Sequence, residues 1–217
     1  MDKTITVKGA GKVSARPDLI IISINLEAQS QDYENTLAIA DNKLEKLRSN
    51  IQKSGFGHDD LKTESFDIMP QFESIQDKSG NYKRVFKGYR CPHSLKIEFD
   101  YDMNRLSQLI SVLAHSDAQP EFSISFSVRD KEAAQAQMLK RAAENARQKA
   151  QILCEASGVV LGELITIDYN WGEIDFYSKT SYEMNNKCMM PCEARSIDIV
   201  PDDIDMSDTA TFVWTIN

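Results

Sequence analysis

The sequence predicts an α+β fold in which three helices pack on one face of a largely antiparallel sheet. Three segments carry apolar residues at helical spacing, and the segments between them alternate apolar and polar residues with the period of two that strands show. The expected order is strand, strand, helix, hairpin, helix, strand, helix, strand, irregular excursion, strand. This order is typical of an α+β layer design.

The first strands surround a glycine-rich stretch that resembles the start of a phosphate-binding loop. Gly9 precedes Gly11 and Lys12, but that loop requires a glycine five positions before the Gly-Lys pair and a hydroxyl directly after the lysine. Thr6 and Val13 stand at those two positions, and the strand-like run LIIISINLEA follows instead of a helix. We therefore predict that the glycines mark a bend or bulge between strand segments and that Lys12 is a surface residue.

The first helix is predicted from apolar residues spaced by alternate steps of four and three, namely Tyr33, Leu37, Ala40, Leu44, Leu47 and Ile51. Ser30 or Asp32 can cap its first turn, and Gly55 can close its last. The stripe is too short for a coiled coil, so we expect it to pack on a sheet.

Two further helices follow. The second is predicted from Leu106, Leu109, Ile110 and Leu113, with Asp102 or Asn104 as its cap. The third runs from Asp130 to Gly158, and its inner stripe is predicted to hold Leu139, Ala142, Ala146, Ala150 and Leu153. Because most of that stripe is alanine, this helix can lie close to a sheet or to another helix.

Strands account for the remaining regular segments. Two alternating runs are joined by turn residues 77–81 as a long hairpin: Phe66, Ile68, Pro70 and Phe72 in the first, and Leu95, Ile97 and Phe99 in the second. Residues 122–128, 161–169 and 209–216 are the other predicted strands. Residues 21–72 and 122–171 both read as strand, long helix, strand, which hints at an internal duplication.

We predict one domain, residues 1–217, that contains an irregular excursion at residues 171–200. Loops of this length inside a compact domain tend to be functional or disordered, and the aromatic residues here argue against simple disorder. We interpret the excursion as an arm that packs on a neighbouring subunit. The candidate interface residues are Trp171, Phe176, Tyr177 and Tyr182.

The cysteines suggest no disulfide scaffold, because the chain has only four. Cys91 and Cys154 lie in regular segments and are expected to be packed. Cys188 and Cys192 flank Met189 and Met190, and these four side chains could be soft ligands for copper(I). Alternatively, the two cysteines could form a redox disulfide. Their spacing fits no common zinc or thioredoxin pattern, and we predict no metal site.

No catalytic constellation emerges from the three histidines. His58 lies in a polar turn and is expected to face solvent, and His115 lies at the end of the second helix, where a cation suits the helix dipole. His93 shares a strand face with Cys91, an arrangement that could begin a metal site but is more typical of a packed histidine. We therefore predict that the chain is not an enzyme and binds no cofactor.

The composition excludes several classes of partner. The chain has 33 acidic and 25 basic residues, a net charge of −8, and no concentrated basic block, so nucleic acids and anionic membranes are poor partners. No apolar run reaches the roughly 18 residues of a membrane span, and the first residues do not resemble a secretory signal. A cytoplasmic location is expected; the alternative is the mature part of an exported envelope protein.

Four stretches in this order resemble the SIMPL-domain family, long catalogued as a domain of unknown function. The first is ITVKGAGKVSARPDLIIISINLEA, in which Val7, Gly9, Gly11, Val13, Ala15, Pro17 and Asp18 match the family signature. Gly88, Tyr89 and Arg90 are similar to its Gly-Tyr-Arg strand. ENARQKAQILCEASGVVLGELITI is similar to its third helix and following strand, and IVPDDIDMSDTATFVWTI to its final strand.

The resemblance implies an α+β domain without an established enzymatic activity or defined site residues. Relatives are commonly exported to the bacterial envelope, tend to form homo-oligomers, and some have been linked to stress tolerance or signalling. We therefore expect a non-enzymatic, self-associating protein. The alternatives are a module that binds a small ligand or peptide, for example between the long hairpin and the third helix, and a thiol- or copper-handling protein that uses residues 188–192.

Overall fold

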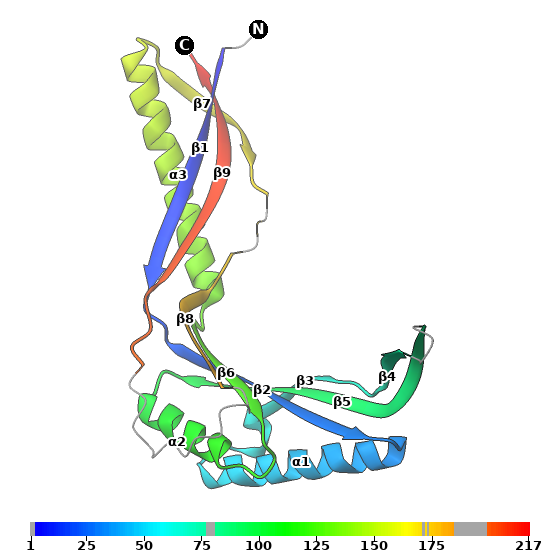
Figure 1. The fold of residues 1–217 in the computed structure, drawn as a ribbon. Coiled ribbons are helices and arrows are strands. Elements are labelled where there is room, and N and C mark those ends of the chain that lie inside the picture. Colours follow the sequence, from blue (N-terminus) through cyan, green and yellow to red (C-terminus); the bar gives the residue numbers. More distant parts are fainter. Residues whose placement is uncertain (1–2, 77–80, 171, 173, 185–198) are drawn as a thin grey trace. The chain divides into compact units, whose positions relative to one another are not determined.

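The chain folds into three α-helices and two sheets in the part that the structure describes (Figure 1). The structure is a computed structural model, and it describes residues 3–76, 81–170, 172, 174–184 and 199–217. The helices are α1 (Tyr33–Lys53), α2 (Met103–Ala114) and α3 (Lys131–Ala156). The strands are β1 (Thr4–Ala15), β2 (Leu19–Ser30), β3 (Leu61–Phe66), β4 (Met69–Gln76), β5 (Tyr82–Asp100), β6 (Glu121–Ser127), β7 (Leu161–Asp168), β8 (Tyr177–Met184) and β9 (Ile204–Ile216). The predicted α+β class is confirmed.

The strands divide between two compact units. The α3 unit comprises Met1–Asp18, Ser127–Lys179 and Pro201–Asn217, and its sheet has the order β1-β9-β7. The α1–α2 unit comprises Leu19–Phe126 and Thr180–Val200, and it contains most of the sheet β3-β5-β2-β6-β8, with β4 paired to β5. Strands β1 and β7 pair antiparallel with β9, and β2, β3 and β4 pair antiparallel with β5. The helices thus cover two sheets instead of the single sheet expected.

The α3 unit is built on a very close contact between helix and strand. The buried stripe of α3 repeats every fourth residue, as Met138, Ala142, Ala146, Ala150 and Cys154. Gly9 and Gly11 of β1 lie directly under it: a Cβ atom at Gly9 would lie 2.0 Å from the Ala142 carbonyl oxygen, and one at Gly11 would lie 1.8 Å from that of Met138. Only a residue without a side chain fits at either position.

The predicted bend or bulge at these glycines is wrong, because β1 pairs with β9 through both positions without a shift in register. The glycines are present because the helix approaches the strand so closely. The predicted stripe on α3 is correct at its alanines, but Leu153 is exposed and Cys154 takes the buried place. Lys12 is exposed, as predicted.

One flank of α3, beside its buried stripe, is hydrogen-bonded to the backbone of β1. Lys149 donates from Nζ to the Lys8 carbonyl oxygen at 3.1 Å, and Arg141 donates from its guanidinium to the Lys12 carbonyl oxygen at 2.5 Å. Between them, the Ala10 amide donates to the Asn145 side-chain oxygen at 3.1 Å. These three side chains recur every fourth residue along the helix, so they satisfy alternate backbone groups of an edge strand that would otherwise be open to another chain.

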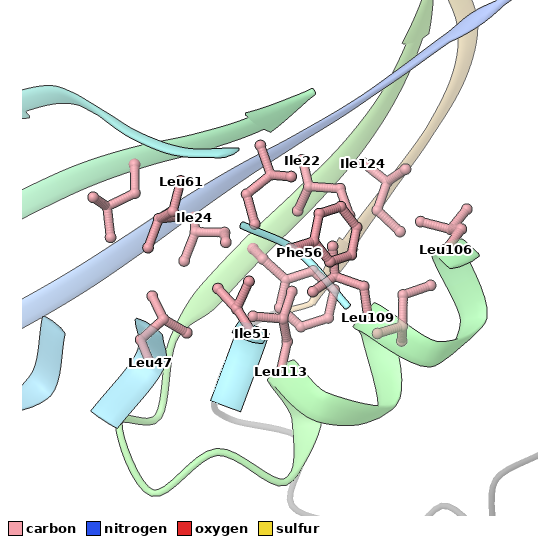
Figure 2. Close-up of a cluster of buried hydrophobic side chains, with 14 of the residues drawn as sticks. Ile22, Ile24, Leu47, Ile51, Phe56, Leu61, Leu106, Leu109, Leu113 and Ile124 are labelled. Carbon is pink, nitrogen blue, oxygen red and sulfur yellow. The ribbon is translucent and has the colours of Figure 1, made fainter. Parts of the chain in front are cut away.

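The α1–α2 unit has a conventional aliphatic core. Ile22 and Ile24 of β2 pack in one cluster with the apolar residues of α1 and α2, and Phe56 lies within that cluster (Figure 2). The three helices begin as predicted: Asp32, Asp102 and Asp130 each accept a hydrogen bond from a backbone amide of the first turn. None of the helices in the described residues has the length and apolar character that crossing a membrane requires.

Two details differ from the predicted strands. The predicted run through Phe66, Ile68 and Phe72 is interrupted at residues 67–68, which separates β3 from β4. Within the predicted excursion, Tyr177–Met184 form β8, which pairs with β6. Residues 171, 173 and 185–198 of the excursion lie outside the described part.

Replacing Gly9 or Gly11 with alanine should destabilise the α3 unit by about 3 kcal/mol, the upper end of what overpacking costs, because the new methyl group would meet helix backbone that cannot rotate away. The free energy of unfolding can be followed by Trp214 fluorescence in urea, in a Trp171→Phe background. Gly172→Ala is the matched control, since a Cβ atom there has no neighbour within 4 Å. An unchanged urea midpoint for Gly11→Ala would contradict the close packing.

Candidate functional site

The three histidines and the two described cysteines were the first candidates for a site, and the structure shows where their side chains lie. His58 is exposed beside Asp59, and the exposed His115 ends α2, with Nδ1 2.8 Å from the Ser111 carbonyl oxygen, as their positions predicted. Cys91 and Cys154 are buried free thiols, also as expected. Among the described residues, no group of three or more histidine, cysteine, aspartate or glutamate side chains is arranged to hold a metal ion. Residues 188–192 lie outside the described part, so the copper or thiol hypothesis stays a prediction.

His93 is the most unusual titratable group. It is buried under α1, its Nε2 lies 3.1 Å from Thr63 Oγ1, and the ring of Phe66 meets it edge-on at 4.9 Å. Its Nδ1 has no hydrogen-bond partner. Burial lowers the pKa of His93, the nearby positive charge of Arg48 lowers it further, and Asp41 opposes this shift. The imidazole is therefore neutral at physiological pH and serves as a packed residue of the core.

Cys91, two residues away on the same strand face, does not complete a nucleophilic pair with His93. Burial raises the pKa of the Cys91 thiol, and the carboxylates of Asp41 and Asp67 raise it further. A thiol held in its protonated form is a poor nucleophile and a poor metal ligand. Among the described residues, neither side chain belongs to a group of three or more potential metal ligands.

The strongest candidate for a functional surface is the β4–β5 ribbon, which we define as β4 together with residues 82–88 of β5. The pairing of β2 with β5 ends at Ser30 and Tyr89, so beyond that point β4 and β5 pair with each other. All side chains of β4 are exposed. Figure 1 shows the ribbon curving away from α1 and from the end of β2. A two-stranded ribbon is at best marginally stable in water without a surface to pack on.

The ribbon carries a chain of aromatic contacts. The rings of Phe72 and Phe86 meet at 5.7 Å, Phe86 meets Tyr89 at 5.3 Å, and Tyr89 meets Tyr33 of α1 at 5.5 Å. Phe72 and Phe86 are nevertheless 46% and 47% exposed. The guanidinium of Arg84 lies 4.7 Å from the centre of the Phe72 ring. The surface is therefore both aromatic and basic, and its rings hold one another in fixed orientations.

The Gly-Tyr-Arg stretch connects the ribbon to the rest of its unit. Gly88 has φ of +125°, and a Cβ atom there would lie 2.2 Å from the Ser30 carbonyl oxygen. The pairing between β4 and β5 shifts register at the same place, between Gln71 and Phe72. Arg90 donates to the Glu27 carboxylate at 2.6 Å, which raises the pKa of Arg90. This stretch therefore positions the ribbon, with Gly88 at the bend and Arg90 as its anchor on β2.

The predicted interface residues occupy different places in the structure. Phe176 is half-buried against the α3 unit's core, and Tyr182 is half-buried against the core of the α1–α2 unit. Tyr177 is 45% exposed, and Trp171 lies outside the described residues. Their role at an interface stays a prediction. The predicted hairpin is present, since β4 pairs antiparallel with β5. Sequence reasoning missed its exposed aromatic surface, although apolar residues at Phe72 and Ile75, which an alternating strand places on opposite faces, were a signal.

Tyr177 borders an acidic recess in the α3 unit, with a cavity volume of about 380 Å³. The recess is lined by Ser14, Asp175, Tyr177, Lys179, Asp202, Asp203 and Asp205. Ser178 donates to the Asp202 carbonyl oxygen at 2.8 Å, and the Tyr177 amide donates to the Asp175 carboxylate at 3.0 Å, so local hydrogen bonds hold both margins. Four carboxylates against one lysine give the recess a negative potential.

His93 should make the stability of the α1–α2 unit depend on pH. Because its pKa is lowered in the folded state, the unfolded chain binds more protons below the ordinary pKa of about 6.5. The free energy of unfolding should therefore fall as the pH drops from about 6.5 through the folded pKa, by at most about 1.4 kcal/mol per pH unit. Above about pH 7 this contribution should be constant.

The measurement is urea unfolding from pH 7.5 to 5, followed by circular dichroism. His93→Gln should flatten the slope between pH 6.5 and 5, whereas His58→Gln, at an exposed histidine, should leave it unchanged. Equal slopes in the wild type and in His93→Gln would show that His93 does not titrate differently in the folded state.

Comparison with known proteins places the chain in a family. A family model described as SIMPL, a protein of unknown function (DUF541), matches residues 5–214 and so spans both units. The 26 kDa periplasmic immunogenic protein of Brucella abortus is 27% identical over 169 residues, which are 75% of this chain and 65% of that protein. The uncharacterized protein YggE of Edwardsiella ictaluri is 21% identical over 166 residues, which are 76% of this chain and 67% of that protein. YggE of Escherichia coli K12 is also 21% identical over 166 residues, which are 76% of this chain and 65% of that protein. The chain belongs to the SIMPL family, whose function is not established.

Proposed function

We propose that this chain is a non-enzymatic protein that associates with copies of itself through the β4–β5 ribbon. The observation that carries the proposal is the ribbon itself, whose exposed aromatic side chains have no core of their own to pack on. Exposed apolar patches with a charged margin are typical of protein interfaces, and aromatic residues contribute most of the energy there. The residues of the Gly-Tyr-Arg motif support this surface and are assigned no catalytic role.

Charge complementarity supports a second copy as the partner. The ribbon has three basic residues, Lys83, Arg84 and Lys87, against one acidic residue, Glu73. Glu73 is already paired with Lys87 at 2.6 Å. The acidic recess of the α3 unit has the opposite charge and the exposed ring of Tyr177 at its margin. We propose that the ribbon of one copy docks at the acidic recess of another. Such a contact joins two different surfaces, and repetition closes a ring or extends a filament.

We also propose that the protein acts in the periplasm. The Brucella relatives are named periplasmic proteins, which supports the exported alternative and not the cytoplasmic expectation. Exposed aromatic surfaces and buried free thiols are compatible with either compartment, so this proposal rests on the relatives alone. A link to stress tolerance or signalling remains an expectation from the family resemblance.

Replacing Phe72 and Phe86 together with serine should weaken association at least tenfold, because each buried aromatic ring contributes about 1.5 kcal/mol or more. The measurement is size-exclusion chromatography with light scattering over a range of concentrations under reducing conditions, compared with the monomer mass of 24.5 kDa. Ile152→Ser is the matched control, since Ile152 is also exposed but lies on α3. If the wild type is monomeric throughout, self-association is wrong.

A charge exchange tests the partner surface. Lys83→Glu with Arg84→Glu should abolish association, and so should Asp203→Lys with Asp205→Lys, because each places like charges opposite one another. A mixture of the two double variants should associate again, since the opposite charges are restored. Lys46→Glu with Lys62→Glu changes the charge equally at exposed sites elsewhere in the α1–α2 unit. Loss of association without recovery in the mixture would leave the ribbon as an interface but reject the acidic recess as its partner.

A further inference from the structure

The α3 unit has an apolar groove that the proposed self-association does not use. Helix α3 packs mainly on β1 and β9 and scarcely touches β7. The buried rings of Phe212 and Trp214, stacked 5.6 Å apart, form the floor of the space between α3 and β7. The cavity volume is about 410 Å³, within the range of small-ligand sites.

The groove follows from the position of α3. Gly9 and Gly11 hold the helix against β1, and its Arg141, Asn145 and Lys149 flank is bonded to the edge of that strand. The helix therefore cannot move across the sheet to cover the third strand.

Two side chains of β7 remain uncovered as a result. Leu164 lies opposite Trp214 and Ile167 opposite Phe212 in the sheet, so both share the face that α3 packs on. They are nevertheless 47% and 54% exposed. An apolar molecule that covers these residues removes their apolar surface from water, which lowers the free energy.

The opposite wall of the groove is polar at one point. Ala143, Arg147 and Gln151 recur every fourth residue on the flank of α3 that faces β7. Arg147 is the one charged residue among the described residues that line the groove, and its side chain is exposed. A guanidinium at the margin of an apolar groove favours a ligand with a carboxylate, which it can bind through two parallel hydrogen bonds.

We propose that this groove binds a medium-chain fatty acid. The hydrocarbon chain lies over Phe212 and Trp214 between Leu164 and Ile167, and the carboxylate pairs with Arg147. The ligand is bound without covalent change. The site lies within the α3 unit and does not include the ribbon or the acidic recess, so it can be tested whether or not the chain self-associates.

The test uses the fluorescence of Trp214 in the full chain. The sequence has two tryptophans, so Trp171→Phe leaves Trp214 as the single reporter at the floor of the groove. Sodium decanoate, titrated below its micelle concentration, should change the emission with saturation. Decyltrimethylammonium, with the same chain length and the opposite charge, should bind at least tenfold more weakly. Equal binding of the two would overturn the carboxylate assignment, and no saturable change with decanoate would overturn the site.

Variants locate the site. Arg147→Gln should raise the half-saturating decanoate concentration about tenfold, the usual loss for one hydrogen-bonded charge. Arg16→Gln, at an exposed arginine that does not line the groove, should leave it unchanged. Leu164→Glu should abolish binding, whereas Val160→Glu, at an exposed apolar residue beside the groove, should not. If Leu164→Glu instead lowers the mass in solution and leaves decanoate binding intact, the groove is covered by a second copy and the proposal is wrong.

Discussion

The contact between two glycines of β1 and the backbone of α3 determines the arrangement of the α3 unit. Because Gly9 and Gly11 have no side chains, the alanine stripe of α3 lies directly on the strand. This fixes the helix over one side of a three-stranded sheet. One flank of the helix then reaches the backbone of β1 and satisfies it, while the other flank stops short of β7. A protected edge and an uncovered apolar strand are two consequences of the same packing.

A third glycine determines the geometry of the α1–α2 unit in a similar way. At Gly88 the backbone takes a conformation that side chains disfavour, and it passes so close to the Ser30 carbonyl oxygen that a Cβ atom would not fit. Strand β5 therefore changes direction where β2 ends, and the β4–β5 ribbon leaves the layer that α1 and α2 cover. The aliphatic core stabilises the unit without the ribbon, so the ribbon's aromatic side chains are available for another surface.

Each unit thus combines a stable core with uncovered surface, one such surface in the α1–α2 unit and two in the α3 unit. The ribbon is aromatic and basic, the recess beside Tyr177 is acidic, and the groove between α3 and β7 is apolar with one cation. The ribbon and the recess have the opposite charges that the proposed contact between copies requires, and the groove has the chemistry that the proposed amphipathic ligand requires. The family signature residues at Gly9, Gly11, Gly88 and Arg90 build the frame that presents the surfaces.

The sequence by itself determined the three helices, the candidate residues for their caps, most of the strands and the α+β class, because these depend on local periodicity and capping. It also determined that Ala142, Ala146 and Ala150 face a closely packed neighbour. Only the tertiary structure decided that Gly9 and Gly11 are that neighbour, that the strands form two sheets, and that Phe72, Phe86, Leu164 and Ile167 are left exposed. An apolar residue in a strand has the same local pattern whether a helix covers it or not, since its burial depends on segments distant in the sequence.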